Sequence, residues 1–217
     1  MKTKNLVVTA MLGAISGVLM VLEIPMFFVL PFIKLDLSEL PIMIGGFVMG
    51  PVWGILVAII KILVKLVIKG TSTAFVGELA NLSAALLYML PAAIIYKKNK
   101  TRKHAGIGMT VGTLAASVGM VILNTFVMFP FYMNLFGIDE AALIGMSSQA
   151  NPLATNMLTI MLFMIFPFNI VKYGIVSILT MLVYKRISGL IKNFDEKHAK
   201  NEKPVLEKQP VKSFEET

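Results

Sequence analysis

The sequence contains no cysteine, and only 15% of its 217 residues are charged. Without cysteine the chain has no disulfide, thiolate metal site, iron–sulfur cluster or cysteine nucleophile. Its two histidines, His104 and His198, lie in polar segments, so the apolar sequence offers no histidine-based metal site or proton relay. The phosphate-binding pattern GxxxxGK[ST] is also missing. We therefore expect a chain that does not hydrolyse ATP itself.

What the sequence has in excess is apolar side chains. Hydrophobic residues make up 57% of the chain, and its mean hydropathy is +0.80. A soluble domain is about 45–50% apolar and about 25% charged, so this composition argues against a soluble enzyme. The net charge of +8 belongs to the apolar part, because residues 1–192 hold 15 Lys and Arg against 6 Asp and Glu, whereas residues 193–217 hold 5 against 6.

The apolar stretches recur at the length of membrane spans. About 20 apolar residues cross a hydrocarbon core of about 30 Å, and short polar or Pro/Gly segments separate such stretches here. The pattern predicts six helices, at residues 5–29, 41–49, 51–69, 74–96, 107–133 and 154–187. The second is too short to span alone, so a re-entrant segment is its alternative.

Three clusters of basic residues predict the orientation. They lie at residues 2–4, 97–103 and 185–192, and short loops rich in Lys and Arg stay in the cytoplasm. All three face the cytoplasm if four helices precede the middle cluster and two follow it. We therefore predict an all-α integral membrane protein with six transmembrane helices and both termini cytoplasmic. The run at 97–103 then marks topology, and we expect no nucleic-acid partner.

The composition changes after residue 192. Residues 193–217 have mixed charge, few apolar side chains and two prolines, so they cannot offset the entropy of ordering by burial. We predict two parts: a six-helix transmembrane substrate-binding domain at 1–192, and a disordered, charged cytoplasmic tail at 193–217.

Polar residues within the apolar segments are the candidates for a binding site. An ionisable group at mid-membrane costs at least about 2.5–3.5 kcal/mol, so it usually faces protein or water. Glu78 and Asn81 share one helix face, as do Asn169 and Lys172, and the predicted topology places both pairs in the outer half. A cavity open to the outside, lined by amides, a lysine and carboxylates, is typical of a small-molecule site. Three further lysines, at residues 61, 65 and 69, lie on one helix face and form a stripe. We expect this lysine stripe to extend mainly toward lipid headgroups.

Small residues recur along the first helix at the spacing that lets helices approach closely in lipid. Ala10 and Ala14 form one such pair, and Gly13 and Gly17 form another. This pattern is consistent with packing inside the chain and with docking against another membrane protein. The residues alone leave both alternatives open.

Four segments carry a resemblance to a known family. They are TAMLGAISG in the first helix, KLDLSELPIMIGGFVMGPVWG from Lys34, GELANLSAALLY from Gly77, and PFNIVKYG from Pro167. Over about residues 5–190 the chain resembles the substrate-binding, or S, components of energy-coupling factor (ECF) vitamin transporters, and most of all their riboflavin-specific type.

The resemblance implies a subunit of the bacterial plasma membrane that is not an enzyme. It would capture riboflavin from outside, as transported ligand and not as cofactor, and deliver it with a transmembrane coupling protein and two ATPases. Ala10 and Ala14 would meet the coupling protein. The implied substrate contacts are Asp36, Glu39, Leu40, Glu78, Asn81, Asn134, Asn169 and Lys172. The alternatives are another vitamin or precursor and, from a different class, a membrane scaffold or enzyme.

Overall fold

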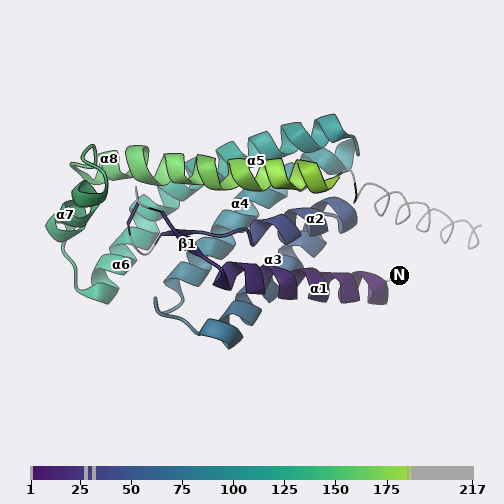
Figure 1. The fold of residues 1–217 in the computed structure, drawn as a ribbon, viewed down its shortest axis with the longest axis horizontal. Coiled ribbons are helices and arrows are strands. Elements are labelled where there is room, and N and C mark those ends of the chain that lie inside the picture. The colour runs from purple at the N-terminus through teal and green to yellow at the C-terminus, as the bar shows by residue number, and fades with distance from the viewer. Residues whose placement is uncertain (1, 27–28, 31–32, 185, 187–217) are drawn as a thin grey trace, which may run out of the picture.

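The structure is a computed structural model that describes residues 2–26, 29–30, 33–184 and 186. The predicted tail at 193–217 lies outside the described residues. The described chain is helical apart from one short strand pair (Figure 1). Its elements up to residue 123 are α1 (Lys2–Val21), β1 (Ile24–Pro25), β2 (Lys34–Leu35), α2 (Glu39–Met49), α3 (Pro51–Lys69), α4 (Val76–Lys98) and α5 (Arg102–Leu123). They are followed by the π-helical turn η1 (Asn124–Met128), α6 (Phe129–Phe136), α7 (Glu140–Ala150), α8 (Met157–Ile160) and the π-helical turn η2 (Met161–Ile165).

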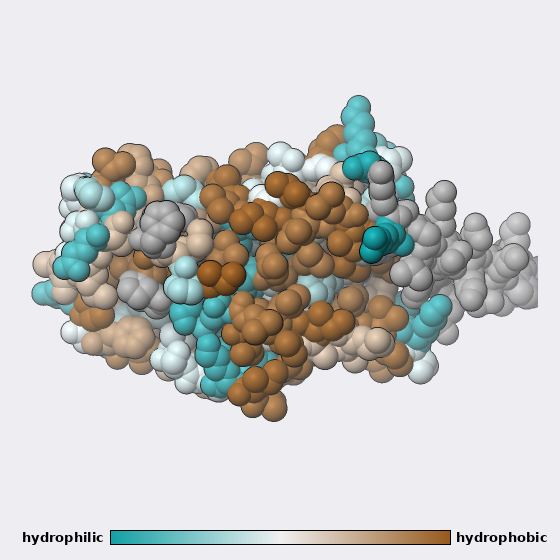
Figure 2. All heavy atoms as spheres, viewed as in Figure 1, coloured by the Kyte–Doolittle hydropathy of each residue, from teal (hydrophilic) through white to brown (hydrophobic). Residues whose placement is uncertain are grey.

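Five helical stretches of the described chain are long and apolar enough to cross a membrane. They are Thr3–Val21, Pro51–Lys69, Val76–Lys98, Arg102–Phe136 and Met157–Tyr184. The predicted second helix corresponds to α2, which has 11 residues. At a rise of about 1.5 Å per residue, α2 covers about half of a hydrocarbon core. Figure 2 shows apolar side chains over much of the middle of the molecule, with polar ones gathered beside the C-terminal end of α1.

The first helix is shorter than the sequence pattern predicts. We expected it to reach residue 29, but α1 ends at Val21, and β1 pairs with β2 in an antiparallel ladder that sets Ile24 opposite Leu35. Pro25 explains the break, because its ring and missing N–H oppose a helical turn. Glu23, just past the helix, pairs with Lys34 at 2.7 Å. This pair ties the end of α1 to the hairpin.

The segment between the last two long helices is also more ordered than expected. The sequence pattern predicted no element between residues 133 and 154, but α7 occupies Glu140–Ala150. The carboxylate of Asp139 caps this helix by accepting a hydrogen bond from the Ala142 N–H at 2.7 Å. A side-chain oxygen at this position satisfies a backbone donor that the first turn leaves free, which explains why a weakly apolar segment is helical.

The small residues of α1 divide between two faces. A Cβ atom on Gly13 would lie 2.4 Å from Ile60 Cγ2 of α3, and one on Gly17 would lie 2.5 Å from Val64 Cβ. The glycines therefore allow the close contact of α1 with α3. Ala10 and Ala14 lie on a different face and are exposed.

Two apolar clusters make up the core. One joins α2, α3, α4 and α5 around Met43, Tyr88 and Met109. The other lies toward the opposite end, where the residues after β1 meet α6, α7 and η2 around Leu30, Phe129 and Met164. The polar residues of interest lie where these clusters meet.

Candidate functional site

A cavity of about 130 Å³ lies between the two apolar clusters, and we call it the central cavity. Its walls come from β2 with the residue before it, α4, α5, η1, α6, η2 and the helical residues that follow η2 as far as Tyr184, which we call the last helix. The lining residues are Ile33, Lys34, Gly77, Ala80, Asn81, Ala84, Met120, Asn124, Tyr132, Ile165, Phe168, Asn169, Lys172 and Tyr173. Apolar residues and residues with a polar or charged group line this cavity in equal numbers. Such a concave surface with convergent polar groups suits a small organic molecule.

Three asparagines supply hydrogen-bond acceptors to the central cavity. The side-chain amides of Asn124 and Asn169 donate to the carbonyls of Met120 and Ile165, at 2.7 and 2.8 Å. Asn81 Oδ1 is buried and accepts no hydrogen bond from another described residue. A buried acceptor without a donor costs about 1–3 kcal/mol, so this oxygen points to a ligand donor.

The two π-helical turns border the same cavity. Asn124 is the first residue of η1, and Ile165 is the last residue of η2. Both line the cavity. Such turns inside α-helices occur frequently at functional sites, because the extra residue shifts the register of the side chains that follow.

Tyr173 adds a rigid polar group. Its ring stacks on Tyr88 of α4 with the centroids 4.5 Å apart. The Tyr173 hydroxyl is buried without a hydrogen-bond partner among the described residues. Stacking fixes the ring, so its hydroxyl is held in place beside the cavity.

Behind the cavity wall lies a buried cluster of four charges, Asp36, Glu39, Lys61 and Lys172, which we call the ion cluster. Lys172 Nζ lies 3.1 Å from Asp36 Oδ2 and 3.1 Å from Glu39 Oε1. Lys61 Nζ lies 3.4 Å from the same Glu39 oxygen. None of the four is more than 5% exposed. Two carboxylates thus face two ammonium groups, and the formal charges cancel.

Ser38 connects the ion cluster to the rest of the fold. Lys61 Nζ donates to the Ser38 hydroxyl at 2.8 Å, and the backbone N–H of Ser38 donates to Asp36 Oδ1 at 2.9 Å. The Ser16 hydroxyl of α1 donates to the Ser38 carbonyl. Glu39 Oε2 has no hydrogen-bond partner among the described residues. The cluster therefore links α1, α3 and the last helix, and it retains one unused carboxylate oxygen.

The remaining lysines of the α3 stripe also pair with carboxylates, so the expectation that they extend mainly to headgroups is wrong. Lys65 pairs with Glu78 and donates to the Gly70 carbonyl at 2.8 Å. Lys69 pairs with Glu23 at the end of α1. These contacts hold the α3–α4 turn and the hairpin against α3.

The eight predicted contact residues thus occupy different environments. Asn81, Asn169 and Lys172 line the central cavity, and Asp36 and Glu39 contact Lys172. Glu78 instead accepts from Lys65 and from the hydroxyls of Thr71 and Thr73 in the α3–α4 turn. The other two predicted contacts are an exposed Asn134 on α6 and Leu40, which packs against the first apolar cluster.

Sequence reasoning did not assign four residues that belong to this region. Lys61 was grouped with a stripe expected to extend toward lipid headgroups, and Asn124 was not among the predicted contacts. Tyr132 and Tyr173 were not considered, although both line the cavity. Tyr173 follows Lys172 directly in the sequence, and this neighbour is the signal that could have indicated it. The π-helical turn that begins at Asn124 is seen only in the structure.

Comparison with known proteins identifies the family. A family model described as ECF transporter, substrate-specific component, matches residues 4–184. The chain belongs to this family. This S component is 32% identical over 191 residues to the riboflavin transporter RibU of Staphylococcus aureus (strain TCH60), covering 88% of this chain and 94% of that protein. It is 30% identical over 199 residues to the riboflavin transporter FmnP of Bacillus subtilis (strain 168), covering 91% and 99%.

A solved structure extends the comparison to three dimensions. It is described as the S component of a bacterial ECF transporter and aligns with a TM-score of 0.69 at 30% identity, covering 88% of this S component and 99% of that chain. The predicted resemblance is therefore confirmed. The apolar helices and this membership make the S component a multi-pass membrane protein, and its relatives are named as transporters, not as enzymes.

Proposed function

We propose that this S component binds riboflavin from outside the cell and delivers it to the cytoplasm with an ECF energy-coupling module. The observation that carries the proposal is the meeting of Lys172, Asn81 and Asn169 at one cavity, with the unused Glu39 oxygen behind its wall on a carboxylate that contacts Lys172. The RibU and FmnP proteins are named riboflavin transporters, and this chemistry suits the same ligand.

A flavin matches the polar groups of the cavity. Its pyrimidine edge carries two carbonyl acceptors and one N–H donor, and Lys172 has donors only whereas Glu39 Oε2 is an acceptor. We assign Lys172 to a flavin carbonyl. Glu39 lies behind the wall beside Lys172, and we assign it to the N–H once the cavity widens. Asn81 and Asn169, which can donate and accept, suit the ribityl hydroxyls, and Phe168 supplies part of the apolar wall. Asp36 does not line the cavity, and its ion pair with Lys172 holds the ammonium group in position.

Only the family resemblance supports the other predicted contacts. Glu78, Asn134 and Leu40 do not line the central cavity, so a direct role requires the site to change shape. Sites for small molecules usually measure about 300–1,000 Å³, whereas this cavity is about 130 Å³. We infer that riboflavin binding widens the cavity on the side of β2 and α6.

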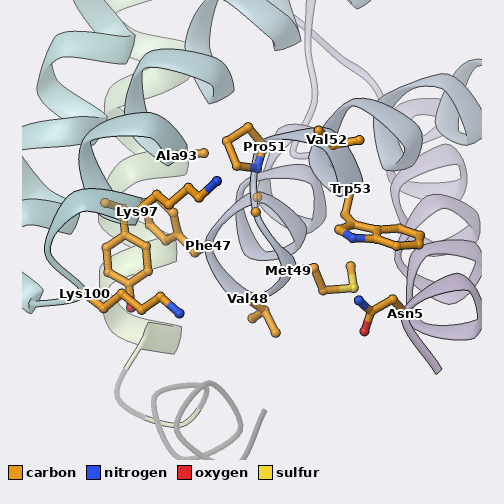
Figure 3. Close-up of a pocket in the computed structure, with 13 residues that line it drawn as sticks. Asn5, Phe47, Val48, Met49, Pro51, Val52, Trp53, Ala93, Lys97 and Lys100 are labelled. Carbon is orange, nitrogen blue, oxygen red and sulfur yellow. The ribbon is translucent and has the colours of Figure 1, made fainter. Parts of the chain in front are cut away.

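We propose that both termini face the cytoplasm, with six crossings formed by residues 1–192. Asn5 of α1 and Lys97 and Lys100 of the predicted cytoplasmic loop line one pocket, so they lie at the same end of the molecule (Figure 3). Tyr184 is at this end too, because its hydroxyl lies 3.1 Å from that of Tyr96. The buried connection before α2, together with α2, would form the second crossing. We propose that 193–217 is a separate cytoplasmic tail.

We propose that α1 docks against the transmembrane coupling protein, which works with two ATPases. The glycine face of α1 is occupied by α3, but Ala10 and Ala14 are exposed, with Met11 and Ile15 beside them. A small-residue face that remains available in lipid allows close approach of another helix.

Purification from cells grown with riboflavin tests the ligand. We expect a yellow protein that releases one flavin per chain and quenches flavin fluorescence at nanomolar to micromolar concentration. A colourless protein that fails to quench would contradict the proposal. A panel of other vitamins in a thermal-shift assay tests the nearest alternative, because only a true ligand raises the melting temperature by mass action.

A further inference from the structure

Two stacked tyrosines of the core differ in what their hydroxyl groups contact. Tyr88 of α4 and Tyr173 of the last helix are both fully buried, and their rings stack with the centroids 4.5 Å apart. The Tyr88 hydroxyl lies 2.8 Å from the Ser177 hydroxyl. The Tyr173 hydroxyl has no hydrogen-bond partner among the described residues. One hydroxyl of the stack therefore has a partner within the fold, and the other does not.

The hydroxyl without a partner belongs to the ring that borders the central cavity. Tyr173 lines this cavity, and Tyr88 does not. Lys172 Nζ lies 5.9 Å from the centroid of the Tyr173 ring, so Tyr173 is beside the group that we assign to a flavin carbonyl. Burying a hydroxyl without a partner is costly, and the stack on Tyr88 holds the ring in place. This arrangement points to a partner that the ligand supplies.

A second unpaired group beside Lys172 is of the opposite kind. Glu39 Oε1 lies 3.1 Å from Lys172 Nζ, whereas Glu39 Oε2 has no hydrogen-bond partner in the described part of the chain. A carboxylate oxygen only accepts a hydrogen bond, and a phenol hydroxyl can donate one. A ligand that presents an N–H beside a carbonyl satisfies both groups. The pyrimidine edge of a flavin has this pattern.

We propose that the Tyr173 hydroxyl donates a hydrogen bond to a carbonyl of the flavin ring and is a specificity-determining residue of the site. This inference rests on the proposed riboflavin function and extends it. Lys172 takes one carbonyl of the pyrimidine edge, Glu39 takes the N–H, and Tyr173 takes the other carbonyl. The ligand class is then a planar ring with a CO–NH–CO edge. A site with such buried polar groups rejects a ligand that leaves them unpaired.

Removing each hydroxyl of the stack in turn tests the proposal. Tyr173→Phe and Tyr88→Phe make the same chemical change on two adjacent rings. Without ligand, Tyr173→Phe should leave the melting temperature of the purified full-length protein unchanged or raise it, because the lost hydroxyl has no partner. Tyr88→Phe should lower the melting temperature, because Ser177 then loses its partner. Thermal unfolding in detergent measures both effects.

Riboflavin titration should rank the two variants in the opposite order. We expect Tyr173→Phe to weaken binding about tenfold, the scale of one hydrogen bond. Tyr88→Phe keeps the stacked ring and should bind within about twofold of the wild type. Fluorescence quenching measures both affinities. Wild-type affinity in Tyr173→Phe would overturn the proposal. An equal loss in both variants would also overturn it, because the stack would then serve only to hold the fold.

Lumiflavin, which has the flavin ring without the ribityl chain, identifies the part of the ligand that Tyr173 contacts. Tyr173→Phe should weaken lumiflavin binding by the same factor as riboflavin binding. A loss confined to riboflavin would place the hydroxyl at the ribityl chain and overturn the assignment to the ring.

The wild-type titration separates this inference from the transport proposal. A wild-type protein that binds no riboflavin contradicts the proposed function itself. A wild-type protein that binds riboflavin no better than Tyr173→Phe contradicts only the role of the Tyr173 hydroxyl.

Discussion

Replacing Lys172 with methionine should weaken riboflavin binding by about 100-fold. A hydrogen bond from a charged donor contributes about 1.5–3 kcal/mol, and Lys172 is the ammonium group that joins the ion cluster to the central cavity. The same change leaves Asp36 and Glu39 with one cation, and an uncompensated buried charge costs about 3–5 kcal/mol of stability. Fluorescence quenching measures the first effect and thermal unfolding the second.

Two double variants separate binding from folding. Lys172→Met/Asp36→Asn and Lys61→Met/Asp36→Asn each leave the ion cluster neutral, with Glu39 facing one lysine. Both should recover most of the stability lost by Lys172→Met. Lys61 does not line the central cavity, so the Lys61 variant should bind riboflavin within a few-fold of the Asp36→Asn protein. If the Lys172 double variant binds equally well, Lys172 is a structural residue and the assigned contact is wrong.

Replacing Ala14 with leucine should lower riboflavin uptake by cells by at least about tenfold and leave riboflavin binding by the purified protein unchanged. Overpacking of a close contact costs about 1–3 kcal/mol, and the exposed Ala14 is proposed to meet the coupling protein. Ala10→Leu should act in the same way. Uptake of labelled riboflavin and pull-down of the coupling protein measure the effect.

The neighbouring residue provides the control. Gly13 contacts α3 within this chain, where a Cβ atom would lie 2.4 Å from Ile60 Cγ2. Gly13→Leu should therefore lower the melting temperature and reduce binding as well as uptake. If Ala14→Leu also reduces binding, both small-residue pairs serve packing inside the chain, and the docking surface must lie elsewhere.

The central cavity shows why part of the site could be anticipated. Asn169 and Lys172 are three residues apart on an apolar helix, so their shared face and the cost of burying them follow from the sequence. The partners of Lys172 do not. Asp36 precedes it by 136 positions, and only the packing of the last helix against the α1–α2 connection brings them together.

Lys61 is a second residue whose partner does not follow from the sequence. Its spacing with Lys65 and Lys69 is regular, and nothing in the spacing separates a lysine that reaches lipid headgroups from one that meets a carboxylate. The structure places Lys61 against Glu39 and leaves it fully buried. A single helix face is visible in the sequence, but what packs against that face is not.

The sequence by itself determined that this is a membrane-spanning S component, because span length and composition depend on local runs of residues and because the LDLSELP segment is distinctive. The tertiary structure decided which residues form the ion cluster and which small residues of α1 already contact α3. Each of these depends on contacts between helices far apart in the chain. Such contacts are set by side-chain fit across the bundle, which no local pattern encodes.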